Sequence, residues 1–202
     1  SSSKTAYGLN SYFGRVNYNY MNKYLLTLTG RADGSSKFGP ENQFAFFPSA
    51  ALAWRASEED FLSENETISN LKIRASYGAT GNSELPAYQA LAGLSNGSVI
   101  FNGARSAYTV PGRMANPDLK WEKTEQVDAG VELGLFNNRI GLELDVYRKL
   151  TSDMLLNAPV PSSSGFTNVF RNVGSLENKG IEINLNTVNF DNELFGWNSN
   201  FN

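Results

Sequence analysis

A period of two in hydrophobicity runs through most of this 202-residue chain and limits what it can fold into. Side chains on a β-strand point to opposite faces in turn, so a strand with one apolar face reads as alternating residues. In Val127–Leu135 and Ile140–Val146 every second residue is Val, Ala, Leu or Ile, a spacing that would scatter apolar residues around a helix. The pattern predicts eight strands, at about Tyr12–Tyr20, Tyr24–Asp33, Phe46–Arg55, Leu71–Thr80, Gln126–Leu135, Ile140–Tyr147, Ile181–Asn186 and a run that begins near Trp197.

The connections between these strands differ in length. Met21–Lys23 and Asn137–Arg139 are short enough for tight antiparallel hairpins. Gly81–Asp118 and Thr151–Ser175 are long, rich in Gly, Ser, Pro and Asn, and predicted to be loops. Because alternate hairpin ends lie on the same side of a sheet, one side carries short turns and the other large loops, as in transmembrane β-barrels. Ala56–Asn70 is the exception, a long connection on the short-turn side.

The strands divide their residues between an apolar and a polar face. Aromatic residues lie near both strand ends: Tyr18, Tyr20, Tyr24, Trp54 and Trp197 beside the short turns, and Tyr12, Phe46 and Tyr77 at the other end. Such belts are typical of the two interfaces of a membrane. We therefore expect the apolar face to contact lipid through Leu26, Leu28, Val131, Leu133, Leu142, Leu144 and Ile183. We expect the polar face to line a wet lumen through Arg15, Arg31, Arg74, Asp128, Glu132, Glu143 and Asp145.

The pattern leaves two alternatives open. A soluble antiparallel β-sandwich that binds glycans also alternates, but it would pack the faces of Leu142/Leu144 and Val131/Leu133 against another sheet. A complete eight-stranded outer-membrane barrel, with an adhesive or structural role, needs eight full strands and mutually paired edges. Several runs reach the ~9–11 residues that cross a bilayer, against the usual ~5–6, which favours a barrel. The eighth run is short, which argues against closure.

Composition excludes several functions. The charges are 17 Lys+Arg and 20 Asp+Glu, a net of −3, so no basic face for nucleic acid is expected. His and Cys are both absent, which excludes the Ser-His-Asp triad, thiolate catalysis, zinc sites and disulfides within these residues. The longest charge-free window, Leu85–Ala104, is interrupted by Pro, Gly and Asn and therefore is no helical membrane span. The polar start Ser1–Lys4 does not resemble a signal peptide, so an internal or processed piece is expected.

No local motif predicts an active site. Glu58–Asp60 is an acidic cluster in a connection, where a solvated turn is the simpler interpretation. Asp33–Lys37 lacks the ligand spacing of an EF-hand, and Gly78–Asn82 lacks the second half of a dinucleotide fingerprint. Glu58–Leu62 and Leu85–Leu91 are candidates for short helices. We expect no catalytic residues, no metal site and no cofactor, and we do not expect an enzyme.

A series of motifs, in order along nearly the whole chain, resembles the barrel of the SusC/RagA-type TonB-dependent outer-membrane transporters. These are Tyr12–Tyr18, Lys23–Leu26, Arg31–Pro40, Phe47–Ser49, Leu71–Gly78, Thr80–Asn82, Asn116–Glu122, Pro161, Ser164–Phe166 and Asn172–Gly180.

The resemblance implies an all-β fold in which residues 1–202 are a segment, of about eight antiparallel strands, of a larger barrel of the 22-stranded type. The plug domain, the TonB-contacting region and the other strands would lie outside this segment. It further implies a Gram-negative outer-membrane importer of oligosaccharides or peptides, lidded by a SusD-like lipoprotein and energised by TonB through the plug. The two long loops would then face outward, where Tyr88, Phe101, Tyr108 and Phe166 are weak candidates for substrate contacts.

Overall fold

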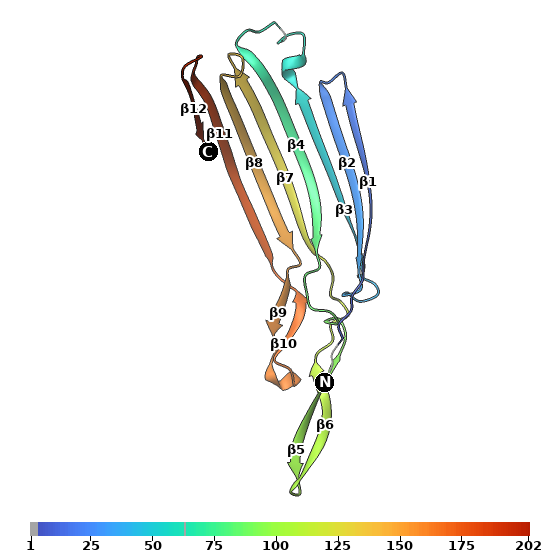
Figure 1. Ribbon diagram of the computed structural model, residues 1–202. Coiled ribbons are helices and arrows are strands. Elements are labelled where there is room, and N and C mark those ends of the chain that lie inside the picture. The colour runs from blue at the N-terminus through green and yellow to red at the C-terminus, as the bar shows by residue number, and fades with distance from the viewer. Residues whose placement is uncertain (1–3, 63) are drawn as a thin grey trace.

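The computed structural model describes residues 4–62 and 64–202, and its main feature is an antiparallel sheet of eight strands (Figure 1). The strands lie in the order β1-β2-β3-β4-β7-β8-β11-β12. Their bounds are β1 Leu9–Tyr20, β2 Tyr24–Ser35, β3 Phe44–Arg55, β4 Ile68–Asn82, β7 Glu122–Leu135, β8 Ile140–Ser152, β11 Ser175–Asp191 and β12 Gly196–Phe201. Each contains or overlaps one predicted strand, so the all-β fold with eight antiparallel strands is confirmed.

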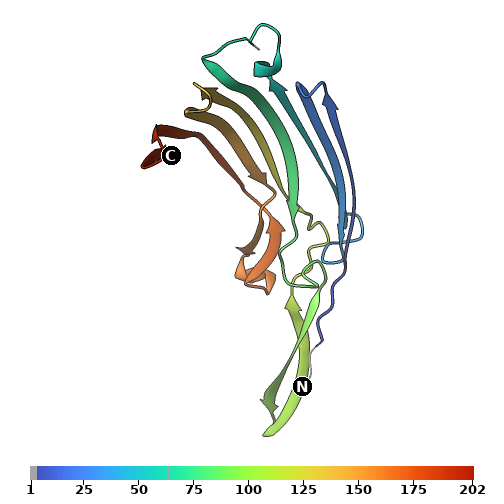
Figure 2. The same cartoon turned by 45° about the horizontal axis from the view of Figure 1, so that its top comes forward.

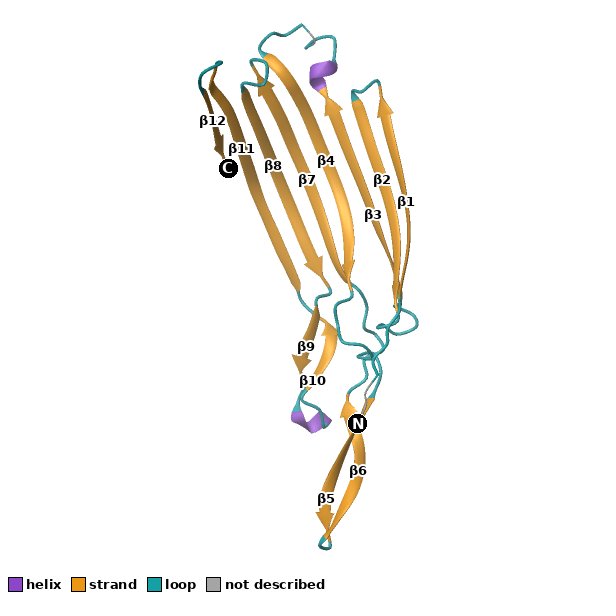
Figure 3. Ribbon diagram, in the orientation of Figure 1, coloured by secondary structure: helices purple, strands orange, loops and turns teal. Residues whose placement is uncertain are grey.

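Two further hairpins lie within connections that were expected to be loops, and that expectation is wrong (Figure 3). β5 (Gly93–Phe101) pairs with β6 (Ala104–Arg113), and β9 (Leu155–Pro159) pairs with β10 (Asn168–Asn172). Asn102 and Gly103 join β5 to β6 with positive φ angles of 50° and 77°. An Asn-Gly pair in this conformation makes a tight hairpin turn, so this dipeptide was the signal for the first hairpin.

The predicted short helices are absent from the described residues. A single 3₁₀ turn, η1 (Ala56–Glu58), lies at the start of the first candidate segment, and a second, η2 (Ser162–Ser164), lies elsewhere. In the other candidate segment Tyr88 has a φ of 67°, which an α-helix does not accommodate. No helix among the described residues has the length and apolarity to span a membrane.

The two ends of the sheet differ as the connection lengths predict. Short turns join β1 to β2, β7 to β8 and β11 to β12 at one end, which we call the turn end (top in Figure 1). Met21 and Asn22 turn the chain tightly there with φ angles of 52° and 59°. Both extra hairpins project from the other end, which we call the loop end. The long connection that contains η1 stays at the turn end, so the exception predicted at Ala56–Asn70 is present.

Strand register places each predicted set of residues on one face of the sheet. One cross-strand row contains Tyr20, Tyr24, Trp54, Ile73, Val131, Leu144 and Ile183. The seven residues predicted to contact lipid all have the parity of this row, and the seven predicted lumen residues have the opposite parity. We call the two surfaces the apolar face and the polar face.

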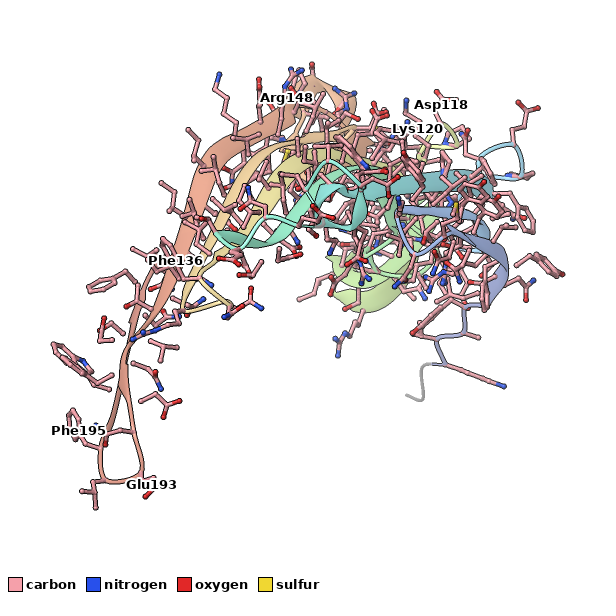
Figure 4. All side chains as sticks on the ribbon, turned by 90° about the horizontal axis from the view of Figure 1, so that it is seen from above. Asp118, Lys120, Phe136, Arg148, Glu193 and Phe195 are labelled. Carbon is pink, nitrogen blue, oxygen red and sulfur yellow. The ribbon has the colours of Figure 1, made fainter. Side chains whose placement is uncertain are left out.

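The sheet is curved (Figure 2). Seen from above, the strands form an arc, and Arg148 lies outside it (Figure 4). Register pairs Arg148 with Val127 of the apolar face. The polar face lines a hollow of about 430 Å³ that includes Thr27, Arg74 and Asp128. An outer apolar and an inner polar surface is the arrangement of a transmembrane barrel wall.

The two edge strands of the sheet do not pair with each other. β1 hydrogen-bonds only to β2 and β12 only to β11 among the described strands, so the sheet is an open arc. The structure therefore does not support the complete eight-stranded barrel. No second sheet packs on the Leu142/Leu144 face within the described part of the chain, which also disfavours the soluble sandwich.

The main buried cluster lies at the loop end, beneath the long connections. The Trp121 ring lies 5.3 Å from that of Phe38 and 5.7 Å from that of Phe47, and its Nε1 donates a 2.9 Å hydrogen bond to the Gln43 carbonyl. Leu119 is fully buried beside them. This cluster fixes the roots of the loops on the sheet, whereas the sheet faces themselves have no such cover.

Candidate functional site

The apolar face is the less buried of the two surfaces. Leu144, Ile183 and Leu52 are 39%, 55% and 58% exposed, although each lies within its strand. A folded monomer in water seldom exposes a contiguous apolar surface of this extent. Removal of apolar area from water is worth about 25 cal/mol per Å², so this face has a strong tendency to be covered.

The polar face carries a chain of ion pairs across three strands. Lys72 Nζ lies 3.1 Å and Arg74 Nη1 3.2 Å from the same Glu132 oxygen, Oε1. Arg74 Nη2 also lies 2.6 Å from Asp145 Oδ2 on β8. The Lys72 and Glu132 side chains are 27% and 23% exposed, less than the apolar residues opposite. Lys72 was missed among the predicted lumen residues, although its parity with Arg74 indicates the same face.

A glycine makes the Arg74–Asp145 pair, which crosses β7 from β4 to β8, sterically feasible. Gly130 lies in register between Arg74 and Asp145, and a Cβ there would overlap both the Asp145 carboxylate and the Arg74 Nε. We expect Gly130→Val to displace the pair and lower the free energy of unfolding by about 1–2 kcal/mol, mainly through overpacking, because exposed ion pairs contribute little.

Chemical denaturation of the refolded full-length protein measures this loss. Gly14→Val is the matched control, since a Cβ at Gly14 meets nothing within 4 Å. An equal loss in both variants would contradict the steric role of Gly130.

The other predicted lumen residues make local contacts on the same face. Arg15 Nε donates to the Thr29 hydroxyl at 3.2 Å, and Arg31 Nε lies 2.6 Å from Asp33 Oδ2. Asp128 accepts hydrogen bonds from the Ser76 hydroxyl at 3.1 Å and from Gln126 Nε2 at 2.8 Å. Glu143 makes no ion pair with a described residue and is exposed. The face is thus a hydrated surface whose charges are mostly matched within the wall.

At the turn end, Glu59 fastens three elements together. Its carboxylate lies 3.0 Å from Lys23 Nζ and accepts hydrogen bonds from the Tyr24 hydroxyl at 2.7 Å and from Trp54 Nε1 at 3.1 Å. Only 17% of the Glu59 side chain is exposed. The expected solvated turn is therefore wrong for this residue, because two belt aromatics and a turn lysine converge on it.

These contacts make the stabilisation by the Glu59 carboxylate sensitive to acid. The hydroxyl of Tyr24, with Lys23 and Trp54, lowers the pKa of Glu59 from 4.5 to about 2, and hydrogen bonding to Glu59 raises the pKa of Lys23. A lowered folded-state pKa means that the stabilisation is complete above about pH 4.5 and is lost as the pH falls toward 2. We expect Glu59→Gln to melt below the wild type at pH 7 and the two melting temperatures to converge near pH 2. A difference that stays constant with pH would contradict this account.

The four aromatic candidates for substrate contact lie apart at the loop end. Phe101 is at the tip of β5, whereas Tyr108 is further down β6, opposite Gly97. Phe166 lies in the connection between β9 and β10, and the Tyr88 hydroxyl accepts a hydrogen bond from the Ala6 amide at 3.1 Å. They line no common cavity among those found in the described residues, and their substrate role stays a prediction.

The side chains do not assemble a metal centre in the described part of the chain. No group of three acidic side chains there is close enough to hold a metal ion. The sheet instead separates two environments, because its outer surface is apolar and its inner surface is hydrated.

Comparison with known proteins adds evidence from homology. Residues 1–202 match the family model described as TonB dependent receptor-like, beta-barrel. The chain is 44% identical over 199 residues to TonB-dependent receptor P26 of Formosa agariphila, with 98% of this chain and 20% of that protein covered. It is 38% identical over 208 residues to TonB-dependent receptor SusC of Bacteroides thetaiotaomicron, with 98% and 21% covered.

Solved structures of the same family also match this chain. A chain of the RagAB peptide transporter superposes with a TM-score of 0.86 at 33% identity, over 96% of this chain and 21% of that one. The protein described here thus spans about a fifth of the length of these relatives.

Proposed function

Because the chain belongs to the TonB-dependent receptor β-barrel family, of the SusC/RagA type, we propose that it forms part of the wall of an outer-membrane importer. The importer would move oligosaccharides or peptides into the periplasm of a Gram-negative cell. The remaining strands and the plug domain would belong to the same full-length protein, as the covered fifth of each relative suggests.

The observation that carries this proposal is the eight-strand apolar face. Leu144 and Ile183 are exposed on this face, and the ion pairs lie on the opposite face. Such a surface is stable in contact with lipid, whereas its exposure to water is unfavourable. Toward the loop end of the same face, Arg148 on β8 pairs in register with Lys179 on β11, and these long side chains can extend to headgroups.

The partners follow from the same reasoning. TonB would supply energy through the plug, and a SusD-like surface lipoprotein would lid the outward mouth above the loop end. The RagAB relative is described as a peptide transporter, which supports peptides as the substrate. Oligosaccharides enter the proposal through the resemblance to the SusC/RagA-type transporters. The barrel wall itself would be passive, with no reaction chemistry of its own.

Cysteine accessibility tests the proposed orientation in the full-length transporter. Residues 1–202 contain no Cys, so in a full-length background without other cysteines, single cysteines at neighbouring positions 143 and 144 report the two faces separately. In outer-membrane preparations we expect the Leu144→Cys variant, carrying a fluorophore, to be quenched by brominated lipid. We expect the Glu143→Cys variant to react with a membrane-impermeant thiol reagent and to show little quenching. Equal behaviour at both positions, or recovery of the protein outside the outer-membrane fraction, would overturn the proposed function.

A further inference from the structure

A second hollow lies at the loop end, between the root of the β5–β6 hairpin and the β9–β10 hairpin. Its volume is about 340 Å³, within the range of small-ligand sites of about 300–1,000 Å³. None of the four aromatic substrate candidates lines it, and no role in the wall described above uses it. We call it the Arg113 cavity, after the one charged residue in its lining.

One wall of the cavity, the β9–β10 hairpin, is held in place by hydrogen bonds. Asn116 Nδ2 donates to the Phe170 carbonyl at 2.8 Å, and Asn172 Nδ2 donates to the Lys120 carbonyl, also at 2.8 Å. A Lys120–Asp153 ion pair of 2.8 Å joins the same two segments. The β9–β10 hairpin is therefore fastened to the loop that precedes β7, which fixes this wall of the cavity.

Glycine at the hairpin root determines how Arg113 lies. A Cβ built on Gly93 would meet Arg113 Cζ and Nη2 at 3.3 Å, so the guanidinium lies close over the bare backbone. Arg113 Nε donates to the Leu91 carbonyl at 3.2 Å. This bond fixes the side chain and leaves both Nη groups available, and two parallel N–H donors match a carboxylate.

The rest of the lining is polar but uncharged. The carboxamides of Gln89, Asn157 and Asn168 contribute donors and acceptors, and the Phe170 ring adds an apolar surface. No acidic residue is in the lining, and Arg113 makes no ion pair with a described residue. A single unneutralised guanidinium suits one negative charge, whereas a phosphate dianion would favour a second cation.

We propose that the Arg113 cavity binds a carboxylate group of the transported substrate, with the three carboxamides hydrogen-bonding to the hydroxyl or amide groups beside it. This inference rests on the proposed importer function and specifies its substrate class. The carboxylate could belong to an acidic sugar or to the C-terminus of a peptide, which offer the guanidinium the same geometry.

Binding to the purified full-length transporter in detergent tests the proposal with four probes. These are trigalacturonate, a neutral galactose trisaccharide, trialanine and C-terminally amidated trialanine. With the wild type we expect at least one carboxylate probe to bind about tenfold or more tightly than its neutral counterpart, and the preference to shrink as NaCl increases. The pair that shows the preference identifies the source of the carboxylate.

Variants of Arg113 test whether this residue causes the preference for carboxylate probes. Arg113→Gln is expected to abolish it, and Arg113→Lys to retain part of it, because the charge remains without the planar pair of donors. Arg105→Gln is the matched control, since Arg105 lies near the tip of the same hairpin and, among the described residues, donates only to the Ser98 hydroxyl, at 2.8 Å. Heat-modifiable migration of each variant checks that the barrel is folded.

Three results would overturn the proposal: no probe binds the wild type, carboxylate and neutral probes bind equally, or the preference survives in Arg113→Gln. The cysteine accessibility assay above separates the two levels of the argument. If residue 144 faces lipid but the transporter shows no preference for carboxylate probes, the cavity proposal is rejected and the proposed importer is left intact. Failure of the accessibility assay itself would reject the importer.

Discussion

Leu144→Arg is expected to lower the free energy of unfolding of the full-length barrel by about 2–4 kcal/mol, the cost of a cation that faces lipid near the bilayer midplane. Leu144 lies in register with Val131 and Ile183 at the centre of the apolar face. Its neighbours on that face offer no carboxylate, so the guanidinium would face hydrocarbon on all sides. Urea titration of the protein refolded into lipid vesicles measures the change.

The control for this variant is its neighbour on the other face. Glu143→Arg places the same side chain opposite Glu132 on β7 and Asn184 on β11, where the surface is hydrated. We expect it to change the unfolding free energy by less than about 1 kcal/mol, as exposed charges usually do. Equal losses from the two substitutions would mean that the assignment of the inner and outer faces is wrong.

Residues 1–202 expressed alone are expected to fail completely as a membrane barrel. The β1 and β12 edges each leave a row of backbone N–H and C=O groups without partners in the sheet. In lipid each such group costs several kcal/mol, so the open arc does not persist there. We expect aggregation through the two edges and no heat-modifiable monomer in detergent.

The full-length transporter is the positive control for this experiment, since we propose that its further strands cover both edges. Protease-resistant, heat-modifiable monomers of residues 1–202 would contradict the prediction. That result would favour the complete eight-stranded barrel, with β12 paired to β1 in lipid.

Much of the fold follows from the sequence alone. Alternation is a local property, because each strand residue takes its face from its neighbours two positions away. Runs such as Ile140–Val146 therefore predict both the strand and its apolar side without knowledge of a partner. Turn lengths are local as well, so the separation into a turn end and a loop end was also predictable.

The hairpins inside the long connections were predictable only in part. The Asn102–Gly103 turn is a local signal for β5–β6 that the surrounding Gly, Ser and Asn residues obscure. β9 and β10 are five residues each and show no clear alternation. Their position depends on distant partners such as Asn116, which no local pattern reveals.

The contacts that join distant strands were decided by tertiary structure. Arg74 reaches Asp145 across Gly130 only because β4, β7 and β8 pair in one register, and a shift by one residue would move all three to the other face. Likewise Glu59 looks like a solvated acid until Lys23, Tyr24 and Trp54 meet around it. Sequence determined which residues share a face, since that depends on period alone. Tertiary structure decided which charges meet, because pairing brings together residues tens of positions apart.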